Sequence, residues 1–278
     1  MSVNISNVWQ SAFDAEVKRA YGNVSSLQGT VYTKTGVVGK EIYFRKKGKG
    51  IATSHTAFAD ITPMDTNFTQ VKCELSGWDA YDYVDEVTMT AINFSEIKEI
   101  AEVAGDALGL RKDQIIIDAM SSGYDSTNHQ VGTTGTALSI NTLLAGKKLL
   151  DEAGVPTEDR YFIHSATQLE DLLKTTQVTS ADYNSVRALV NGEIGSFLGM
   201  KFICIANRTE GGLPLENSNA DVLGFIYHKR AVGFGLGKDI ATKMEYVPQK
   251  LSYMVGGSFY AGAVVIDNQG VVGVLSAK

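Results

Sequence analysis

Residues 93–120 read NFSEIKEIAEVAGDALGLRKDQIIIDAM, and this stretch decides how the rest of the chain is interpreted. Its apolar residues recur mostly at steps of three and four, the spacing of one buried helix face. Asn93 or Ser95 can cap the start, because either side chain accepts a hydrogen bond from a free backbone N–H. At about 1.5 Å per residue, such a helix spans roughly 40 Å. The stretch therefore predicts one long helix.

A strand that leads directly into a helix is predicted from residues 160–173, which read RYFIHSATQLEDLL. The first five residues are typical of a buried strand. Ser165 and Gln168 have the spacing of a capping box, in which each side chain bonds the other residue's backbone N–H. A helix at 140–150 precedes this unit, and Gly154 fits a left-handed cap at its end.

A glycine-studded stretch follows at residues 188–200, which read ALVNGEIGSFLGM. It predicts the end, near Gly192, of a helix that begins at Asp182. Apolar strands are predicted next at 201–206 and 222–227, separated by a polar loop.

The C-terminal third of the chain changes character and predicts further strands with short turns between them. These strands are expected at 243–247, 251–255, 262–266 and 271–275. Residues 267–270 read DNQG, a tight-turn sequence that closes the last hairpin.

Residues 29–90 look extended, with strands expected at 41–45 and 71–75. Between them the segment 50–69 has few strong apolar positions, which predicts a long hairpin with a flexible middle. A bare two-stranded hairpin is not stable alone in water. It must lie on another surface, either of its own chain or of a neighbour.

The first 28 residues predict one amphipathic helix, from the spacing of Trp9, Phe13 and Val17. An arm that packs elsewhere and a first helix of the core are both open. The start of the chain lacks a basic segment followed by an apolar block, so no secretory signal is expected.

Composition bounds the class of protein. With 278 residues and 44% hydrophobic content, the chain can bury a sizeable core. Its net charge of −6 does not mark a nucleic-acid-binding protein. Its longest apolar runs fall far short of the ~20 residues that cross a bilayer, so no membrane association is expected. Cys73 and Cys204 lie far apart and are expected to be reduced and buried.

Catalytic motifs are scarce, so no catalytic residue, cofactor or metal site is predicted. The four histidines lack metal-site spacing, and His164 and His228 each close an apolar strand, which favours a structural role. Residues 233–238 read GFGLGK and partly match a phosphate-binding loop. Val232 stands where that loop needs its first glycine, and Asp239 stands where it needs a hydroxyl. A flexible glycine-rich turn between a helix and a strand is predicted instead.

Two groups of charged residues are candidate contacts between subunits, although solvated charges explain both equally simply. The basic group could also touch nucleic acid. The basic group comprises Arg45, Lys46, Lys47 and Lys49, and the acidic group comprises Asp79, Asp82, Asp85 and Glu86.

The order of these segments resembles a tailed-phage major capsid protein, whose Hong Kong 97-type fold is shared with bacterial encapsulin compartments. Residues 107–115, ALGLRKDQI, resemble the end of the family's long "spine" helix. Residues 160–173 resemble the strand–helix step of its axial domain, and the turn at 191–195 leading to 199–202 resembles a third family element. Similarity in this order covers nearly the whole chain.

The resemblance implies an α+β fold divided into five segments. They are an N-terminal arm (1–28), an extended β-hairpin loop (29–76), a peripheral domain with the spine helix (77–137), an axial domain (138–240) and strands returning to the peripheral domain (241–278).

The same resemblance implies a structural coat protein, not an enzyme, that self-assembles into the icosahedral shell around phage double-stranded DNA. Its expected partners are copies of itself as pentamers and hexamers, a separate scaffolding protein, a portal, and DNA in non-specific contact. It is expected in the virion, after assembly in the bacterial host cytoplasm. The alternatives are an encapsulin-like compartment shell and an α+β small-molecule enzyme.

Overall fold

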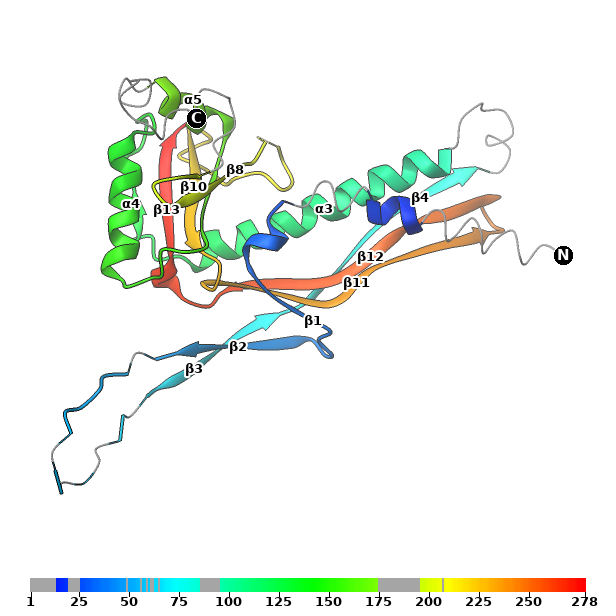
Figure 1. The fold of residues 1–278 in the computed structure, drawn as a ribbon. Coiled ribbons are helices and arrows are strands. Elements are labelled where there is room, and N and C mark those ends of the chain that lie inside the picture. Colours follow the sequence, from blue (N-terminus) through cyan, green and yellow to red (C-terminus); the bar gives the residue numbers. More distant parts are fainter. Residues whose placement is uncertain are drawn as a thin grey trace.

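The computed structural model describes residues 14–19, 26–48, 50–55, 57–58, 60, 63–64, 66–85, 96–174, 196–206 and 208–278. Within these residues the body consists of a long sheet and a shorter sheet joined by a long helix, and a hairpin projects from it (Figure 1). The predicted helix that begins at Asp182, the cap at Asn93 or Ser95, and Trp9 and Phe13 lie outside the described residues.

The helices are α3 (Glu96–Gly123), α4 (Ile140–Glu152) and α5 (Ala166–Lys174), residues 14–19 are also helical, and η1 (Gln28–Thr30) and η3 (Asn268–Gly270) are single 3-10 turns. The strands are β1 (Tyr32–Thr35), β2 (Glu41–Lys47), β3 (Phe68–Glu74), β4 (Ser76–Asp85), β5 (Gln130–Val131), β6 (Arg160–His164), β7 (Ser196–Phe197), β8 (Met200–Cys204), β9 (Leu215–Glu216), β10 (Asp221–His228), β11 (Val232–Val247), β12 (Ser252–Val265) and β13 (Val271–Ala277). None of the helices within the described part of the chain combines the length and apolar character that a membrane span needs.

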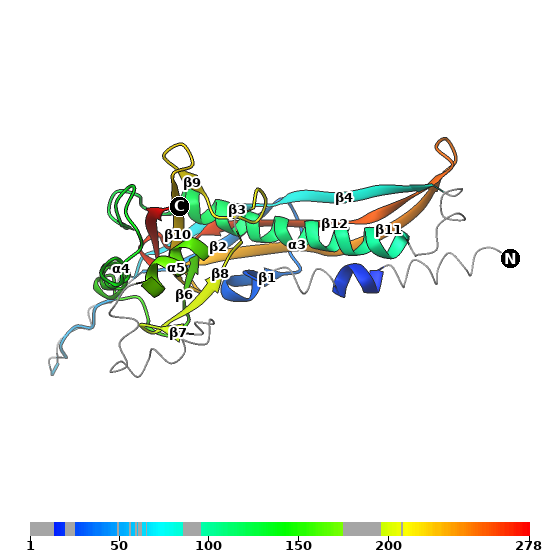
Figure 2. The same ribbon diagram turned by 90° about the horizontal axis from the view of Figure 1, so that it is seen from above.

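The long sheet has the strand order β1-β11-β12-β4. α3 lies along one of its faces, as Figure 2 shows from above. Alternate residues of β11, among them Phe234 and Leu236, face the core that α3 completes. The sequence predicted short strands at 243–247, 251–255 and 262–266, but β11 and β12 are continuous strands of 16 and 14 residues. The prediction failed because glycines in both strands were interpreted as turns.

The shorter sheet has the order β5-β13-β10-β6-β8-β7, with β9 on β10. β6 and β10 are buried at every residue. The predicted capping box at the start of α5 is confirmed: Gln168 N donates to Ser165 Oγ at 3.2 Å, and Ser165 N donates to Gln168 Oε1 at 3.0 Å. Gly154 takes the expected left-handed conformation, with φ of 68°.

Three glycines of β11 and β12 let the hairpin pack closely on the long sheet. Gly233 and Gly235 of β11 point away from α3, toward the hairpin strand β2. A Cβ at Gly233 would lie 2.9 Å from the Phe44 ring, and one at Gly235 would lie 3.0 Å from Ile42 Cγ2. Gly262 of β12 pairs with Gly235, and a Cβ at Gly262 would lie 2.1 Å from the carbonyl oxygen of Glu74 in the hairpin strand β3. We call Gly233, Gly235 and Gly262 the glycine row. The predicted flexible turn at 233–238 is therefore wrong, because these glycines make room for side chains within a strand.

The segment before β1 is held to α3 by a buried carboxylate. Asp113 is fully buried, and its oxygens accept hydrogen bonds from Ser26 N, Ser26 Oγ and Leu27 N, each at 3.1 Å. The neighbouring Lys112, also fully buried, places Nζ 3.4 Å from Asp239. These contacts fix the point at which the chain enters the long sheet.

The helical residues 14–19 pack on their own subunit. Val17 is fully buried in the main core, and the Thr242 hydroxyl donates a hydrogen bond to Asp14. Of the two interpretations left open for this helix, a helix of the core agrees with these described residues.

The strand pairing differs from the predicted segments at two places. β1, placed in the extended loop at 29–76, pairs in parallel with β11 of the body. β13, placed with the peripheral strands at 241–278, pairs with β10 in the shorter sheet. Both differences come from long-range pairing, which neither strand's own sequence encodes.

The cysteine prediction holds for only one residue. Both thiols are free, but Cys73 is buried and Cys204 is exposed. Burial along β8 falls from Met200, which is buried, through the half-buried Phe202 and Ile203 to Cys204 at the exposed end of the strand.

Asp113→Ala should lower the free energy of unfolding by about 2 kcal/mol, because it leaves the buried N–H of Leu27 and the partly buried N–H of Ser26 without an acceptor. Urea denaturation of the dissociated subunit measures this change. Asp106→Ala, at an exposed position of the same helix, is the control and should change stability by less than about 0.5 kcal/mol. Equal losses in the two variants would show that Asp113 does not hold the segment before β1 to α3.

Candidate functional site

The hairpin has one buried face and one open end. β2 and β3 pair in a regular antiparallel register, and Ile42, Phe44 and Cys73 turn toward the glycine row. Burial raises the pKa of the Cys73 thiol to about 11. The hairpin therefore rests on its own body along β2 and β3.

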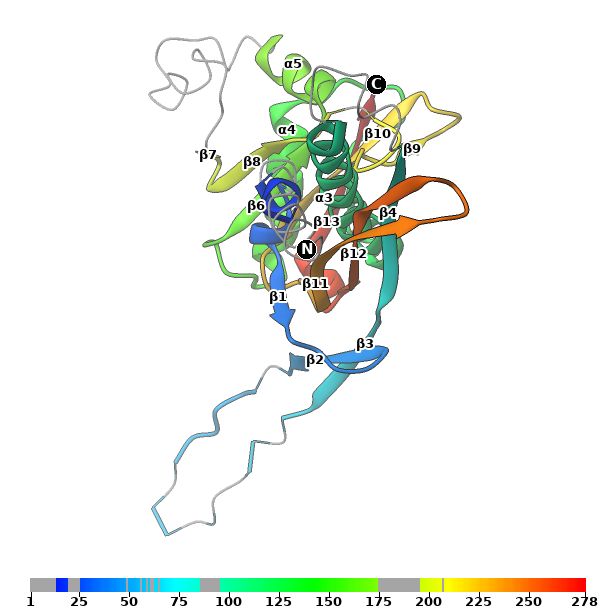
Figure 3. The same cartoon turned by 90° about the vertical axis from the view of Figure 1, so that its right-hand side faces the viewer.

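Beyond Lys47 and Phe68 the chain continues outward, away from both sheets (Figure 3). Large apolar side chains on this projecting part meet solvent in the single subunit: Ile51 is 82% exposed, Phe58 is fully exposed, and Met64 is 55% exposed. Exposed apolar residues gathered on one segment mark an interaction surface.

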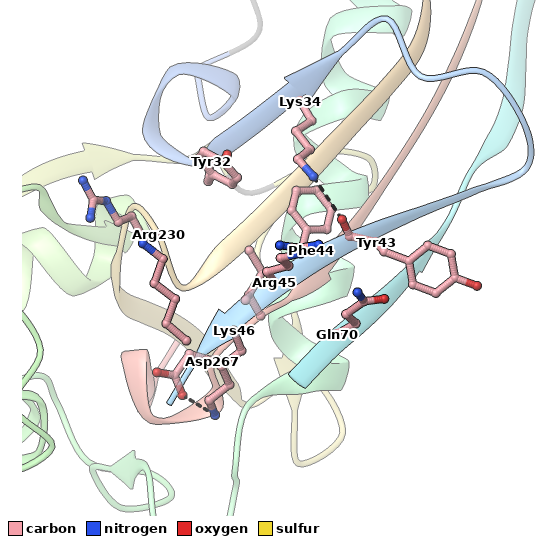
Figure 4. Close-up of a pocket in the computed structure, with 11 residues that line it drawn as sticks. Tyr32, Lys34, Tyr43, Phe44, Arg45, Lys46, Gln70, Arg230 and Asp267 are labelled. Carbon is pink, nitrogen blue, oxygen red and sulfur yellow. Dashed lines mark hydrogen bonds and ion pairs between the residues drawn. The ribbon is translucent and has the colours of Figure 1, made fainter. Parts of the chain in front are cut away.

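A basic hollow opens at the root of the hairpin, with a volume of about 810 Å³. Four parts of the chain form it: β1, the hairpin, the turn that follows β10 and the turn that follows β12 (Figure 4). The residues that give the basic hollow its character are Tyr32, Lys34, Phe44, Arg45, Lys46, Lys47, Arg230 and Asp267.

Two of the five cations in the basic hollow have partners inside it. Lys46 Nζ lies 2.9 Å from Asp267 Oδ1. Lys34 Nζ donates to the Tyr43 carbonyl at 3.0 Å and lies 5.2 Å from the centre of the Phe44 ring.

The other three cations are Arg45, Lys47 and Arg230. Among the described residues, no carboxylate oxygen lies within 4.0 Å of their charged groups. The hollow is therefore positive within an acidic chain.

The structure brings together part of the predicted basic group. Arg45, Lys46 and Lys47 line the same hollow, while Lys49 lies outside the described residues. Lys34 and Arg230 were missed, because each lies outside the basic run of the sequence and joins the group only through folding.

The predicted acidic group lies elsewhere, on the edge strand β4, which runs away from the hairpin (Figure 1). Asp79, Asp82 and Asp85 are exposed, and Glu86 lies outside the described residues. Successive strand residues face opposite sides, so Asp79 and Asp85 share one face and Asp82 lies on the other. These carboxylates form an acidic edge, not one acidic patch.

An aromatic cluster at the far end of the long sheet was not predicted. Tyr246 and Tyr253 pair across β11 and β12 with ring centres 5.1 Å apart. Lys250 Nζ lies 3.7 Å from the centre of the Tyr83 ring, and Leu251 between the strands is exposed. Lys250 and Tyr83 are more than 160 residues apart in the sequence, so no local pattern predicts their contact.

His164 and His228 have structural partners. The Nδ1 atom of buried His164 lies 2.9 Å from the Ser165 carbonyl, and burial lowers the pKa of His164. The backbone N–H of Arg230 donates to Nδ1 of His228 at 3.2 Å, and burial is again the main cause of a lowered pKa. In the part of the chain that the structure describes, no cluster of three or more His, Cys, Asp or Glu side chains is placed to hold a metal ion.

Comparison with known proteins gives one family. The model of a family described as phage capsid protein matches residues 5–277. No curated protein sequence matches the chain.

Several solved structures share the fold. The capsid of cyanophage P-SCSP1u is 16% identical, with a TM-score of 0.69 over 90% of this chain and 87% of that chain. The head of Helicobacter pylori bacteriophage KHP40 is 10% identical, with a TM-score of 0.74 over 92% and 91%. A virus-like particle from Pyrococcus furiosus is 13% identical, with a TM-score of 0.64 over 99% and 100%.

Gly235→Val should lift the hairpin from the sheet, because the added methyl groups would overlap Ile42 and Leu75. The rate at which a thiol reagent modifies Cys73 should rise roughly tenfold or more, since overpacking costs about 1–3 kcal/mol. The measurement uses a Cys204→Ser background, so that only Cys73 reports.

Gly77→Val is the matched control, because a Cβ there meets its nearest neighbour at an ordinary 3.6 Å. An unchanged Cys73 rate in Gly235→Val would show that the glycine row does not seat the hairpin.

Proposed function

Because this chain belongs to the phage capsid protein family, we propose that its copies associate as pentamers and hexamers of an icosahedral shell around double-stranded DNA. The protein is a structural coat protein that forms the shell of a phage particle. The family match over residues 5–277 is the observation that carries this proposal.

The projecting part of the hairpin supports association between copies. Its large apolar residues Ile51, Phe58 and Met64 are exposed to solvent in a single subunit. Burying one such side chain stabilises a contact by about 1.5–3 kcal/mol. We infer that this part of the hairpin lies over an adjacent subunit.

The body divides naturally into the two regions that a shell subunit needs. We propose that the long sheet and α3 form the peripheral domain, and that the shorter sheet with α4 and α5 forms the axial domain near the symmetry axes. The N-terminal segment (1–28), predicted as an arm, packs its described residues 14–19 on the core, and together with the extended loop it completes the subunit. In this division we assign β1 to the peripheral domain and β13 to the axial domain, because β1 pairs with β11 and β13 pairs with β10.

The predicted charged groups complement each other. We propose that Arg45 and Lys47 on the hairpin contact acidic residues of a neighbouring subunit, and we propose the same role for Lys49, which lies outside the described residues. The acidic edge, with Glu86 at its end, is the proposed counterpart. Charged contacts of this kind set orientation and partner choice more than affinity.

The remaining partners are also proposals. A separate scaffolding protein would guide assembly in the bacterial host cytoplasm, and a portal would replace one pentamer. Contact with packaged DNA would be non-specific and salt-sensitive. The protein would act through assembly and would not catalyse a reaction.

A compartment shell that holds protein cargo is the second candidate. The similarity to the Pyrococcus furiosus virus-like particle extends over 99% of this chain and the whole of that chain, which favours keeping it. Particles purified from a producing cell distinguish the two, because a DNA-filled shell and a protein-filled shell differ in their ratio of absorbance at 260 and 280 nm.

The purified protein, alone or with a scaffolding protein, should form closed particles tens of nanometres wide, because weak contacts between subunits add up over many copies. Negative-stain electron microscopy and sedimentation check this result. A stable monomer under all conditions that assemble capsid proteins would contradict the proposal.

Replacing residues 48–67 with Asn-Gly should leave a folded subunit that forms no particles, because β2 and β3 keep their seat while the projecting part is lost. Circular dichroism reports folding, and negative-stain microscopy reports assembly. A second variant, Ile51→Ser/Phe58→Ser/Met64→Ser, keeps the loop length and removes its exposed apolar side chains. Normal particles from both variants would show that the projecting part is dispensable.

A further inference from the structure

We propose that the basic hollow is a docking site for the acidic edge of a second copy of this chain, with Asp79 and Asp82 of that copy facing Arg45, Lys47 and Arg230. The inference rests on the proposed function, because it presupposes that copies associate. It adds two body residues, Lys34 and Arg230, to a contact otherwise assigned to the hairpin alone.

The charge of the basic hollow calls for an anionic partner. Five cations and one carboxylate, Asp267, line a space of about 810 Å³. Three of the cations, Arg45, Lys47 and Arg230, have no carboxylate partner among the described residues. Like charges that line one hollow repel each other, and carboxylates that enter the space relieve that repulsion.

One carboxylate of the chain itself already lies in the hollow. Asp267 sits at its rim and pairs with Lys46 at 2.9 Å. That pairing neutralises Lys46 and leaves the other cations for a second carboxylate. Lys46, one of the predicted contact residues, therefore belongs to the wall of the hollow, and Arg45, Lys47 and Arg230 face the partner.

The acidic edge supplies the matching charge. β4 is the outermost strand of the long sheet, so its side chains can reach another molecule without rearrangement of the body. Asp79 and Asp82 are exposed and lie on opposite faces of this strand, so their side chains flank its free edge from the two sides. A partner that meets the strand edge-on can therefore contact both carboxylates. Asp85 already interacts within its own chain and is not needed for the contact.

A second copy suits the hollow better than a nucleic acid does. The chain is acidic overall, at −6, so its copies repel one another unless opposite charges meet locally. The basic hollow and the acidic edge provide this local attraction between opposite charges. Their separation within one subunit prevents them from satisfying each other, so the contact forms only between copies.

A charge exchange tests the proposal in the full-length protein. Arg45→Glu/Lys47→Glu/Arg230→Glu should raise the protein concentration needed for particle formation roughly tenfold or more, since like charges would then face each other. Adding Asp79→Lys/Asp82→Lys to the same chain should restore assembly to within about threefold of the wild type. Sedimentation and negative-stain microscopy measure assembly, and circular dichroism of the dissociated subunit confirms folding.

Lys148→Glu is the matched control, because Lys148 is an exposed cation on α4, outside the hollow. It should leave the threshold concentration unchanged. If wild type assembles and the triple variant assembles equally well, this inference fails while the proposed function stands. If wild type forms no particles, the proposed function itself fails.

Two further outcomes would also overturn the inference. One is loss of assembly that the Asp79→Lys/Asp82→Lys exchange does not restore, even partly. The other is normal assembly of the triple variant together with loss of binding to a short DNA duplex at low salt. That second result would assign the hollow to a polyanion.

Discussion

The close approach of the hairpin to the glycine row is the contact on which the rest of this molecule depends. Ile42 and Phe44 occupy space that any side chain at Gly233 or Gly235 would fill. Their burial contributes about 1.5–3 kcal/mol each, enough to hold a two-stranded hairpin that water alone would not stabilise. The sheet is consequently covered on both faces, by α3 on one side and by the hairpin on the other. The direction of the projecting part and the shape of the basic hollow both follow from this contact.

The hairpin divides into two parts with different energetics. The part formed by β2 and β3 completes its burial within the subunit. The part beyond Lys47 keeps its apolar residues exposed. A coat protein needs both: a fixed root gives each copy the same geometry, and an unsatisfied end makes association favourable.

Local signals were sufficient for the elements whose stability is local. The capping box of Ser165 and Gln168, the buried strand β6 and the long helix α3 were all predicted from short patterns. Residues 233–238 were misinterpreted, because a glycine that admits a neighbouring side chain looks the same in sequence as a glycine that turns the chain. The basic hollow was predicted only in part, since Lys34 and Arg230 reach it through contacts between distant segments. The contact between the acidic edge and the hairpin is still a prediction.

β11 is a single strand that runs from the hairpin to the aromatic cluster. One end of this strand carries the hairpin's seat, and the other carries Tyr246 of the aromatic cluster. With 16 residues at roughly 3.3 Å each, the strand is a lever about 50 Å long. Its pairing with β12 shifts register between Leu236 and Lys238 and again between Lys238 and Ala241, and such irregularities bend a strand locally. From Lys238 to Val247 the strand is roughly 30 Å long, so bending by a few degrees at these two irregularities moves its far end by about 1–3 Å. The angle at which that end of a subunit meets its neighbours in a shell therefore depends on how two breaks in a hydrogen-bond ladder are accommodated.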